Sequence, residues 1–232
     1  MSDNLFTTVV VFGIIEAAVI LGFIIFFLHS AISKRLRQNK VDHFGDAAEK
    51  KVVDFLKKTF PRATVMESVY LKTATGLTEL DILMICDRGL FIIEVKSHNG
   101  EINTDGKFWT QRWKGKTIRF HNPVHQNNVH RAALEAVFRK RQSLASLPVY
   151  TVAVFTSATV SFSKNVKDVI KLSSLSRYIK HKSQDKRMTR DMIKQTEKFI
   201  SSNMETSRIR QNQHKRKIYN SNSKKRAYRI NR

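Results

Sequence analysis

Two charged side chains interrupt an apolar stretch of the sequence, "IIEVKSHNG" at residues 92–100. Successive side chains of a strand point to opposite faces, so Glu94 and Lys96 project from the same face. The preceding apolar stretch, "TELDILMIC", carries a further carboxylate at Asp81. Burying charged groups in apolar strands costs free energy unless a partner, a ligand or a reaction requires them. Asp81, Glu94 and Lys96 are therefore the first candidates for chemistry.

The loop between the two stretches decides whether these side chains meet. A two-residue loop formed by Arg88 and Gly89 predicts a register in which Asp81 lies opposite Lys96. Asp81, Glu94 and Lys96 then share one face of a sheet, whereas a loop one residue longer would separate them.

This combination of groups suits a metal-assisted reaction. Two carboxylates can bind Mg²⁺ or Mn²⁺ through oxygen while the ion keeps water molecules for a nucleophile. A nearby ammonium group stabilises the negative charge that develops on a phosphate. The three residues therefore predict hydrolysis of phosphodiester bonds. The alternative is an ordinary salt bridge between Glu94 and Lys96 at a solvated sheet edge, which needs no metal.

The elements that must hold these residues follow from hydrophobic periodicity. Residues 44–60 have the spacing of an amphipathic helix that ends before Pro61. Its predicted apolar stripe comprises Phe44, Ala48, Val52, Phe55, Leu56 and Phe60. The elements predicted next are strands at 64–71, 78–86 and 90–97, a hairpin with Trp109 and Trp113, a helix from about Pro123, a buried strand at 149–160, and helices at 172–182 and 188–203. The order αβββ, hairpin, αβ predicts an α/β fold with a mixed sheet flanked by helices.

Several motifs together resemble a known family. "GDAAEKKV", "TELDILMI", "GLFIIEVKSHNGEI", Trp109 and "NPVHQNNVHRA" are similar to the nuclease-related domain (NERD) of the PD-(D/E)XK nuclease-like superfamily, roughly over residues 41–156. The resemblance implies a restriction-endonuclease-like αβββαβ core and a Mg²⁺-dependent (or Mn²⁺-dependent) nucleic-acid site. One departure is Leu80, which stands where the family's half-motif has proline.

The resemblance also implies roles for two further residues. By position, Glu49 on the first helix and Gln126 on the helix after the sheet join Asp81, Glu94 and Lys96 as catalytic residues. Asp81, Glu94 and Glu49 are the implied metal ligands. The alternatives are that Glu49 is a surface helix residue and that Gln126 only caps backbone amides.

A zinc site is not expected. His121, His125 and His130 are loosely spaced and have no cysteine beside them. The single cysteine, Cys86, excludes an intrachain disulfide and CxxC zinc modules.

The N-terminal sequence predicts a membrane anchor. Residues 5–28 are apolar apart from Glu16 and are long enough to span a bilayer as one helix. Lys34, Arg35, Arg37 and Lys40 follow, which places the rest of the chain in the cytoplasm and the N-terminus outside. Small residues spaced four apart within the span also allow a homodimer through this helix.

The formal charge of +23 points to a polyanionic partner. Residues 206–232 hold ten Lys or Arg and no acid, and they are predicted to be a disordered tail that neutralises phosphates. The nucleic-acid-binding residues predicted there are Lys215, Arg216, Lys217, Lys224, Lys225 and Arg226. An anionic lipid surface is the alternative partner for this tail.

These predictions divide the chain into five parts. They are a transmembrane anchor (1–30), a basic linker (31–40), a NERD-like nuclease domain (41–160), a helical extension (161–205) and the basic tail (206–232). The expected function is a membrane-anchored, Mg²⁺-dependent nuclease that acts on nucleic acid, with DNA favoured. The alternative is a catalytically inactive module of the same fold that binds or tethers DNA at the membrane.

Overall fold

A computed structural model describes residues 23–30, 44–73, 76–182 and 187–215. The chain divides into two compact units, residues 1–46 and 47–232. In the first unit residues 23–30 are helical. Within the described ranges, no helix is both long and apolar enough to cross a membrane. Glu16 and most of the predicted span at 5–28 lie outside those ranges, so the anchor and the homodimer stay predictions.

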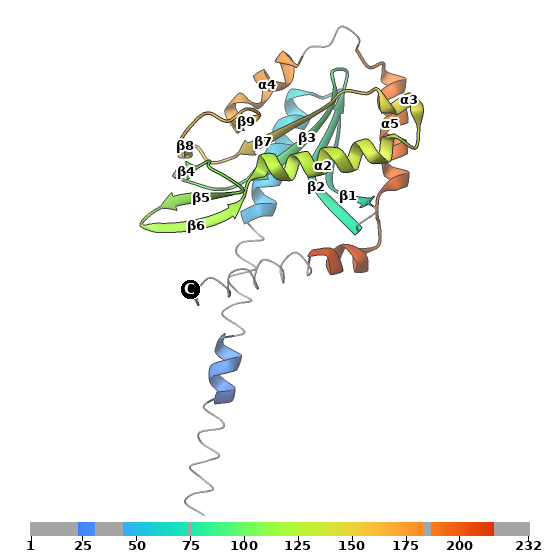
Figure 1. Cartoon of the computed structure of the whole chain (residues 1–232). Coiled ribbons are helices and arrows are strands. Elements are labelled where there is room, and N and C mark those ends of the chain that lie inside the picture. The colour runs from blue at the N-terminus through green and yellow to red at the C-terminus, as the bar shows by residue number, and fades with distance from the viewer. Residues whose placement is uncertain (1–22, 31–43, 74–75, 183–186, 216–232) are drawn as a thin grey trace, which may run out of the picture. The chain divides into compact units, whose positions relative to one another are not determined.

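The second unit follows the predicted order of elements (Figure 1). A helix over residues 44–59, most of which belongs to this unit, precedes three strands, β1 (Thr64–Thr73), β2 (Gly76–Cys86) and β3 (Gly89–Lys96). The next elements are β4 (Glu101–Asn103), β5 (Phe108–Trp113), β6 (Lys116–His121), α2 (Pro123–Phe138), α3 (Gln142–Ala145) and β7 (Val149–Phe155). The chain continues through β8 (Ser161–Phe162), β9 (Val169–Lys171), η1 (Leu172–Ser174), α4 (Leu175–His181) and α5 (Arg190–Asn203).

The main sheet is mixed, as predicted. Its strand order is β1-β2-β3-β7-β9, with β1, β2 and β3 antiparallel and β7 parallel to both β3 and β9. The predicted hairpin is formed by β5 and β6 and belongs to a second sheet, β6-β5-β4-β8. The strand predicted at 149–160 ends earlier, at Phe155, and sequence periodicity did not predict the short strands β8 and β9.

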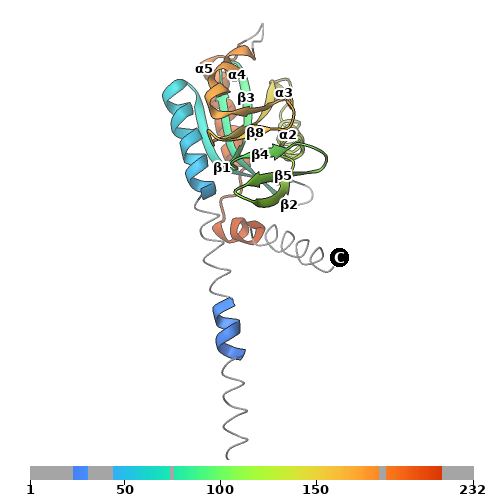
Figure 2. The same ribbon diagram turned by 90° about the vertical axis from the view of Figure 1, so that its left-hand side faces the viewer.

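Helices cover both faces of the main sheet (Figure 2). Residues of α2, α3 and α5, among them Leu134, Leu144 and Ile200, pack with one set of buried strand side chains. The helix over residues 44–59 and α4 pack on the opposite set. The fold is therefore a three-layer α/β/α arrangement with a core on each side of the sheet.

The first helix buries a shorter stripe than its sequence predicts. Ala48, Val52 and Leu56 are buried, whereas Phe44 is 70% exposed. The prediction for Phe44 was wrong because the buried stripe begins one turn further along, at Ala48.

The predicted loop between β2 and β3 was also wrong. Cys86 pairs with Gly89, so the two loop residues are Asp87 and Arg88. Gly89 has a φ of +127°, and a side chain there would come within 2.6 Å of the Pro148 carbonyl oxygen. Glycine is therefore needed for the close approach of the chain entering β7, and it lies in the strand and not in the turn. The register moves by two residues, an even number, so each β3 side chain keeps its face.

The start of the basic tail is ordered, contrary to prediction. Residues 208–215 are helical. The buried carboxylate of Glu205 accepts hydrogen bonds from the Ser207 backbone N–H (2.9 Å) and the Arg210 side chain (3.0 Å). The Glu205 N–H in turn donates to the Tyr70 carbonyl at the edge of the main sheet (2.8 Å). A buried acid thus fixes the first turn of the tail.

Candidate active site on β2 and β3

Asp81 lies where the pairing of β2 with β3 stops. The last pair is Ile82 with Ile93, and beyond it the Val95 backbone N–H donates to Asp81 Oδ2 at 2.8 Å. The two-face alternation of β2 also breaks here, because Leu80 and Leu83 pack in the same core while Ile82 packs in the other. This local break holds the Asp81 carboxylate against the β3 backbone.

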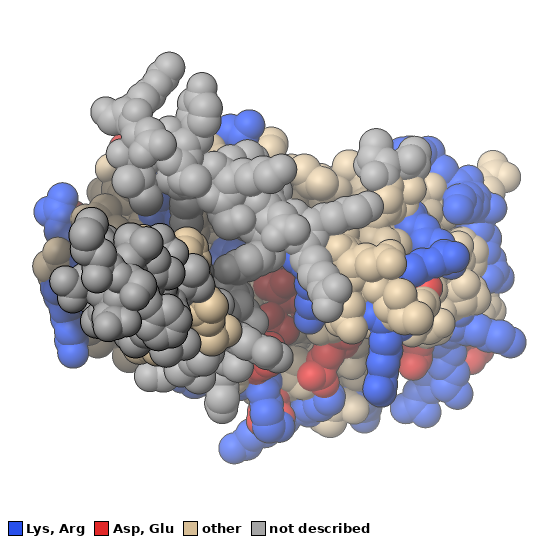
Figure 3. All heavy atoms as spheres, turned by 90° about the horizontal axis from the view of Figure 1, so that it is seen from below, with Lys and Arg blue, Asp and Glu red and all other residues tan. Residues whose placement is uncertain are grey.

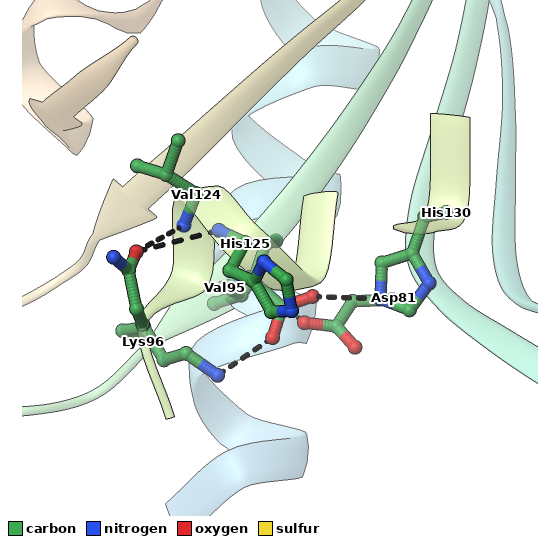
Figure 4. A network of polar contacts seen from close by, with 8 residues as sticks. Asp81, Val95, Lys96, Val124, His125 and His130 are labelled. Carbon is green, nitrogen blue, oxygen red and sulfur yellow. Dashed lines mark hydrogen bonds and ion pairs between the residues drawn. The ribbon is translucent and has the colours of Figure 1, made fainter. Parts of the chain in front are cut away.

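Glu94 is a buried carboxylate with two cationic or potentially cationic neighbours. Its Oε1 accepts from Lys96 Nζ at 2.6 Å, and its Oε2 lies 3.4 Å from His130 Nε2. The Glu94 side chain is 4% exposed and those of Lys96 and His130 are 16% and 12% exposed. Figure 4 shows Asp81, Lys96 and His130 directed toward one small region beneath the first turn of α2.

The two carboxylates respond to this environment in opposite ways. Burial opposes ionisation of Glu94, but the charge of Lys96 and hydrogen bonds from His130 and Lys96 outweigh it and lower its pKa to about 2. Burial, followed by the negative charge of Glu94, raises the pKa of Asp81 well above its usual value. The positive charge of Lys96 therefore offsets the burial of the Glu94 carboxylate much more fully than that of the Asp81 carboxylate.

Glu49 contributes a third negative charge. It is half-buried on the helix over residues 44–59, and its charge adds to burial in raising the pKa of Asp81 and of Tyr70. Burial opposes the charge on Lys96, but Glu94, Asp81 and Glu49 together raise its pKa. The helix thus brings Glu49 close enough to act on the residues of β2 and β3.

The capping role that was the alternative for Gln126 belongs to another residue. Asn122 Oδ1 accepts from the backbone N–H groups of Val124 (2.9 Å) and His125 (3.3 Å), which begins α2 (Figure 4). The Gln126 Oε1 atom is buried and has no hydrogen-bond partner among the described residues. Gln126 therefore carries an acceptor that the described protein atoms leave unused.

His130 belongs to this site, although the sequence analysis weighed it only as a possible zinc ligand. It lies four residues after Gln126, on the same side of α2. While Nε2 faces Glu94, Nδ1 lies 3.0 Å from the Thr78 hydroxyl on β2. The i, i+4 spacing from Gln126 was the signal that could have identified it.

No group of three or more His, Cys, Asp or Glu side chains forms a ready-made metal centre within the described ranges. Of the predicted tail residues, Lys215 is described, and its Nζ lies 3.8 Å from Glu79 Oε1. The remaining tail residues predicted to bind nucleic acid, Arg216, Lys217, Lys224, Lys225 and Arg226, lie outside the described ranges.

The raised pKa of Asp81 has a consequence for stability. In the folded, metal-free protein the carboxyl group of Asp81 favours its protonated form, which stabilises the fold below the unfolded pKa of about 4. This stabilisation is lost as the pH rises from there through the raised pKa of Asp81, because ionising the group costs free energy. Asp81→Asn keeps an acceptor for Val95 and does not titrate. We expect it to raise the melting temperature in EDTA near neutral pH, with a gain that disappears below about pH 4. Thermal unfolding across a pH series measures this, and a gain independent of pH would contradict it.

Comparisons with known proteins match the part of the chain that carries these residues. Residues 44–156 match the family model of NERD, the nuclease-related domain. An uncharacterized protein of Bacillus anthracis is 32% identical over 151 residues, which cover 63% of this chain and 65% of that protein. The chain thus spans slightly less than two thirds of this relative. No solved structure gives a significant match.

Proposed function

We propose that this chain, whose residues 44–156 match the family model of the nuclease-related domain, is a nuclease that hydrolyses phosphodiester bonds with a divalent cation. The observation that carries the proposal is the buried Glu94 carboxylate, held between Lys96 and His130 beside Asp81. A salt bridge at a solvated edge, the alternative from the sequence, does not describe a carboxylate that is 4% exposed.

The residues fit Mg²⁺ or Mn²⁺ in charge and in donor type. The negative charges of Glu94, Asp81 and Glu49 all act on the Lys96 ammonium, and carboxylate oxygen is the ligand that these hard cations prefer. The raised pKa of Asp81 and the unused Gln126 Oε1 acceptor both indicate missing positive charge or a missing donor. Asp81 and Glu94 would hold the ion, with Glu49 as a third candidate. When bound, the ion would supply an activated water and neutralise phosphate charge.

The chain's own groups have distinct tasks in this proposal. Lys96 keeps its proton because its pKa is raised, so it acts as a positive charge near the phosphate and not as a general base. His130 and Lys96 fix the two oxygens of Glu94. The Val95 N–H fixes one oxygen of Asp81. Carboxylates fixed in this way need little reorganisation during the reaction.

DNA at the membrane is the substrate that we favour. The formal charge of +23 suits a polyanion. The apolar stretch at 5–28 with its following basic residues supports a single-pass anchor with the nuclease domain in the cytoplasm.

The direct test is a cleavage assay on the purified full chain in mild detergent. Plasmid, linear duplex, single-stranded DNA and RNA are each incubated with Mg²⁺, Mn²⁺ or EDTA. We expect cleavage of DNA with either metal and none in EDTA.

The second candidate function is a module that binds DNA without cleaving it. It is favoured by one observation, that both oxygens of Glu94 already have protein neighbours. Normal DNA binding by a wild-type protein that cleaves no substrate would establish this module in place of the nuclease.

A further inference from the structure

We propose that the β5–β6 hairpin is an arm that binds double-stranded nucleic acid and holds it beside the acidic site. The identity of the site at its base rests on the proposed function, whereas the binding surface rests on the hairpin itself. In Figure 1 the two strands extend away from the main sheet, beyond the start of α2.

The first observation is charge. Residues 106–121 contain five cations and no acid, and all five cations are exposed. They are Lys107, Arg112, Lys114, Lys116 and Arg119. Arg112 shares an exposed ion pair with Glu101 at 3.7 Å. Figure 3 shows many Lys and Arg side chains around one face, with Asp and Glu atoms near its middle and toward one side. A cationic arm complements the phosphates of nucleic acid.

The second observation is that aromatic side chains of the hairpin support its cations. The Arg119 guanidinium lies 4.2 Å from the centre of the Phe108 ring. Lys114 Nζ lies 5.8 Å from the Trp113 ring centre, and that ring packs so closely on Gly100 that a Cβ there would be 2.6 Å from it. Trp109 is 1% exposed. Trp109 therefore offers no open face on which a single-stranded base could stack, whereas Trp113 is 37% exposed.

The third observation is the shape of the arm. Six residue pairs join β5 to β6, and Lys114 and Gly115 form a two-residue turn with positive φ values of +48° and +71°. Such a turn matches the twist of a hairpin. Two strands lie about 5 Å apart, and a two-stranded ribbon fits the major groove of a duplex, which is about 12 Å wide. Positive charge on a narrow ribbon therefore favours a duplex over a single strand.

The fourth observation ties the base of the arm to the site. The Phe120 ring on β6 stacks on His98 with ring centres 3.9 Å apart, and His98 follows Lys96 by two residues. Asn122, directly after β6, donates to the Gly106 carbonyl at 3.1 Å and also caps α2, which carries His130. A duplex held along the arm would therefore lead toward Lys96 and the carboxylates.

The test measures binding in EDTA, where no cleavage is needed. Full-length wild type is compared with a triple variant that carries Lys114→Gln, Lys116→Gln and Arg119→Gln, using a labelled duplex and its single strand across a salt series. We expect about a tenfold or larger loss of duplex affinity and a salt slope shallower by about three, because three phosphate contacts are removed. Affinity for the single strand should change much less.

The matched control removes the same charge elsewhere. Lys140→Gln, Lys194→Gln and Lys198→Gln neutralise exposed residues just after α2 and on α5, and the duplex affinity of this variant should stay close to wild type. Equal losses of duplex affinity in both triple variants would overturn the proposal that the arm binds duplex. So would equal losses of affinity for duplex and for single strand in the arm variant. If the arm variant loses duplex binding while wild type never cleaves, the arm stands and the nuclease proposal fails. If wild type cleaves and the arm variant binds duplex normally, the nuclease stands and the arm fails.

Discussion

Glu94→Gln should reduce metal-dependent cleavage by about a thousandfold or more, because the site loses the buried one of its two strand carboxylates and several kcal/mol of transition-state stabilisation. The amide keeps the shape of the side chain and its acceptor for Lys96. Binding of DNA in EDTA should be equal or tighter, since a negative charge that repels phosphate has been removed. Single-turnover rates and EDTA binding curves on the same duplex measure both effects.

A matched control for Glu94→Gln is Glu67→Gln. Glu67 is an exposed residue of β1 that pairs with Lys57, and its substitution makes the same change in charge. We expect little change in its cleavage rate. If Glu94→Gln cleaves DNA as fast as this control does, Glu94 has no part in the reaction.

Lys96→Met should have the largest effect on stability. It leaves the Glu94 carboxylate, 4% exposed, without its closest cation, and breaking a buried ion pair by removing one partner costs about 3–5 kcal/mol. Because Lys96 lowers the pKa of Glu94, the loss should be full near neutral pH and shrink as Glu94 becomes protonated below about pH 4. Cleavage should fall as well. Denaturant unfolding across a pH series, with rates from the folded fraction, tests this.

A double variant separates structure from chemistry. Lys96→Met combined with Glu94→Gln removes both charges and should recover most of the lost stability without recovering cleavage. Lys57→Met breaks an exposed pair, in which the side chains are 56% and 51% exposed, and should cost less than about 1 kcal/mol. Full activity in the stable double variant would show that the ion pair is structural and that the site lies elsewhere.

The side-chain alternation of β3 could be predicted from sequence because it depends only on local geometry. Glu94 and Lys96 are two residues apart, and they form a contact of 2.6 Å. The register between β2 and β3 could not be predicted, because Gly89 is placed by its contact with Pro148, which is remote in sequence. The register error was two residues, an even number, so Glu94 and Lys96 kept the face that the sequence predicted for them.

Other parts of the site depend on contacts that periodicity does not encode. The position of Asp81 depends on a break in the alternation of β2 and on the Val95 N–H. His130 comes close to Glu94 only because α2 packs on the face of the sheet that carries Glu94. The order in the first turn of the tail likewise depends on Glu205, a single acid that pairs across the sheet edge with Lys72 (3.7 Å). Composition alone predicted that this segment is disordered, because composition does not include the contacts of Glu205.

The proposed role of Asp81 and Glu94 is to hold a divalent cation with which water hydrolyses phosphodiester bonds. A single-turnover experiment tests this role: excess wild-type chain is bound to an end-labelled duplex in EDTA, and Mg²⁺ is then added in excess over the chelator. We expect no product before the addition, and product formation after it at a rate that Glu94→Gln reduces by about a thousandfold. Fully bound duplex that remains intact after Mg²⁺ and after Mn²⁺ would rule out the nuclease.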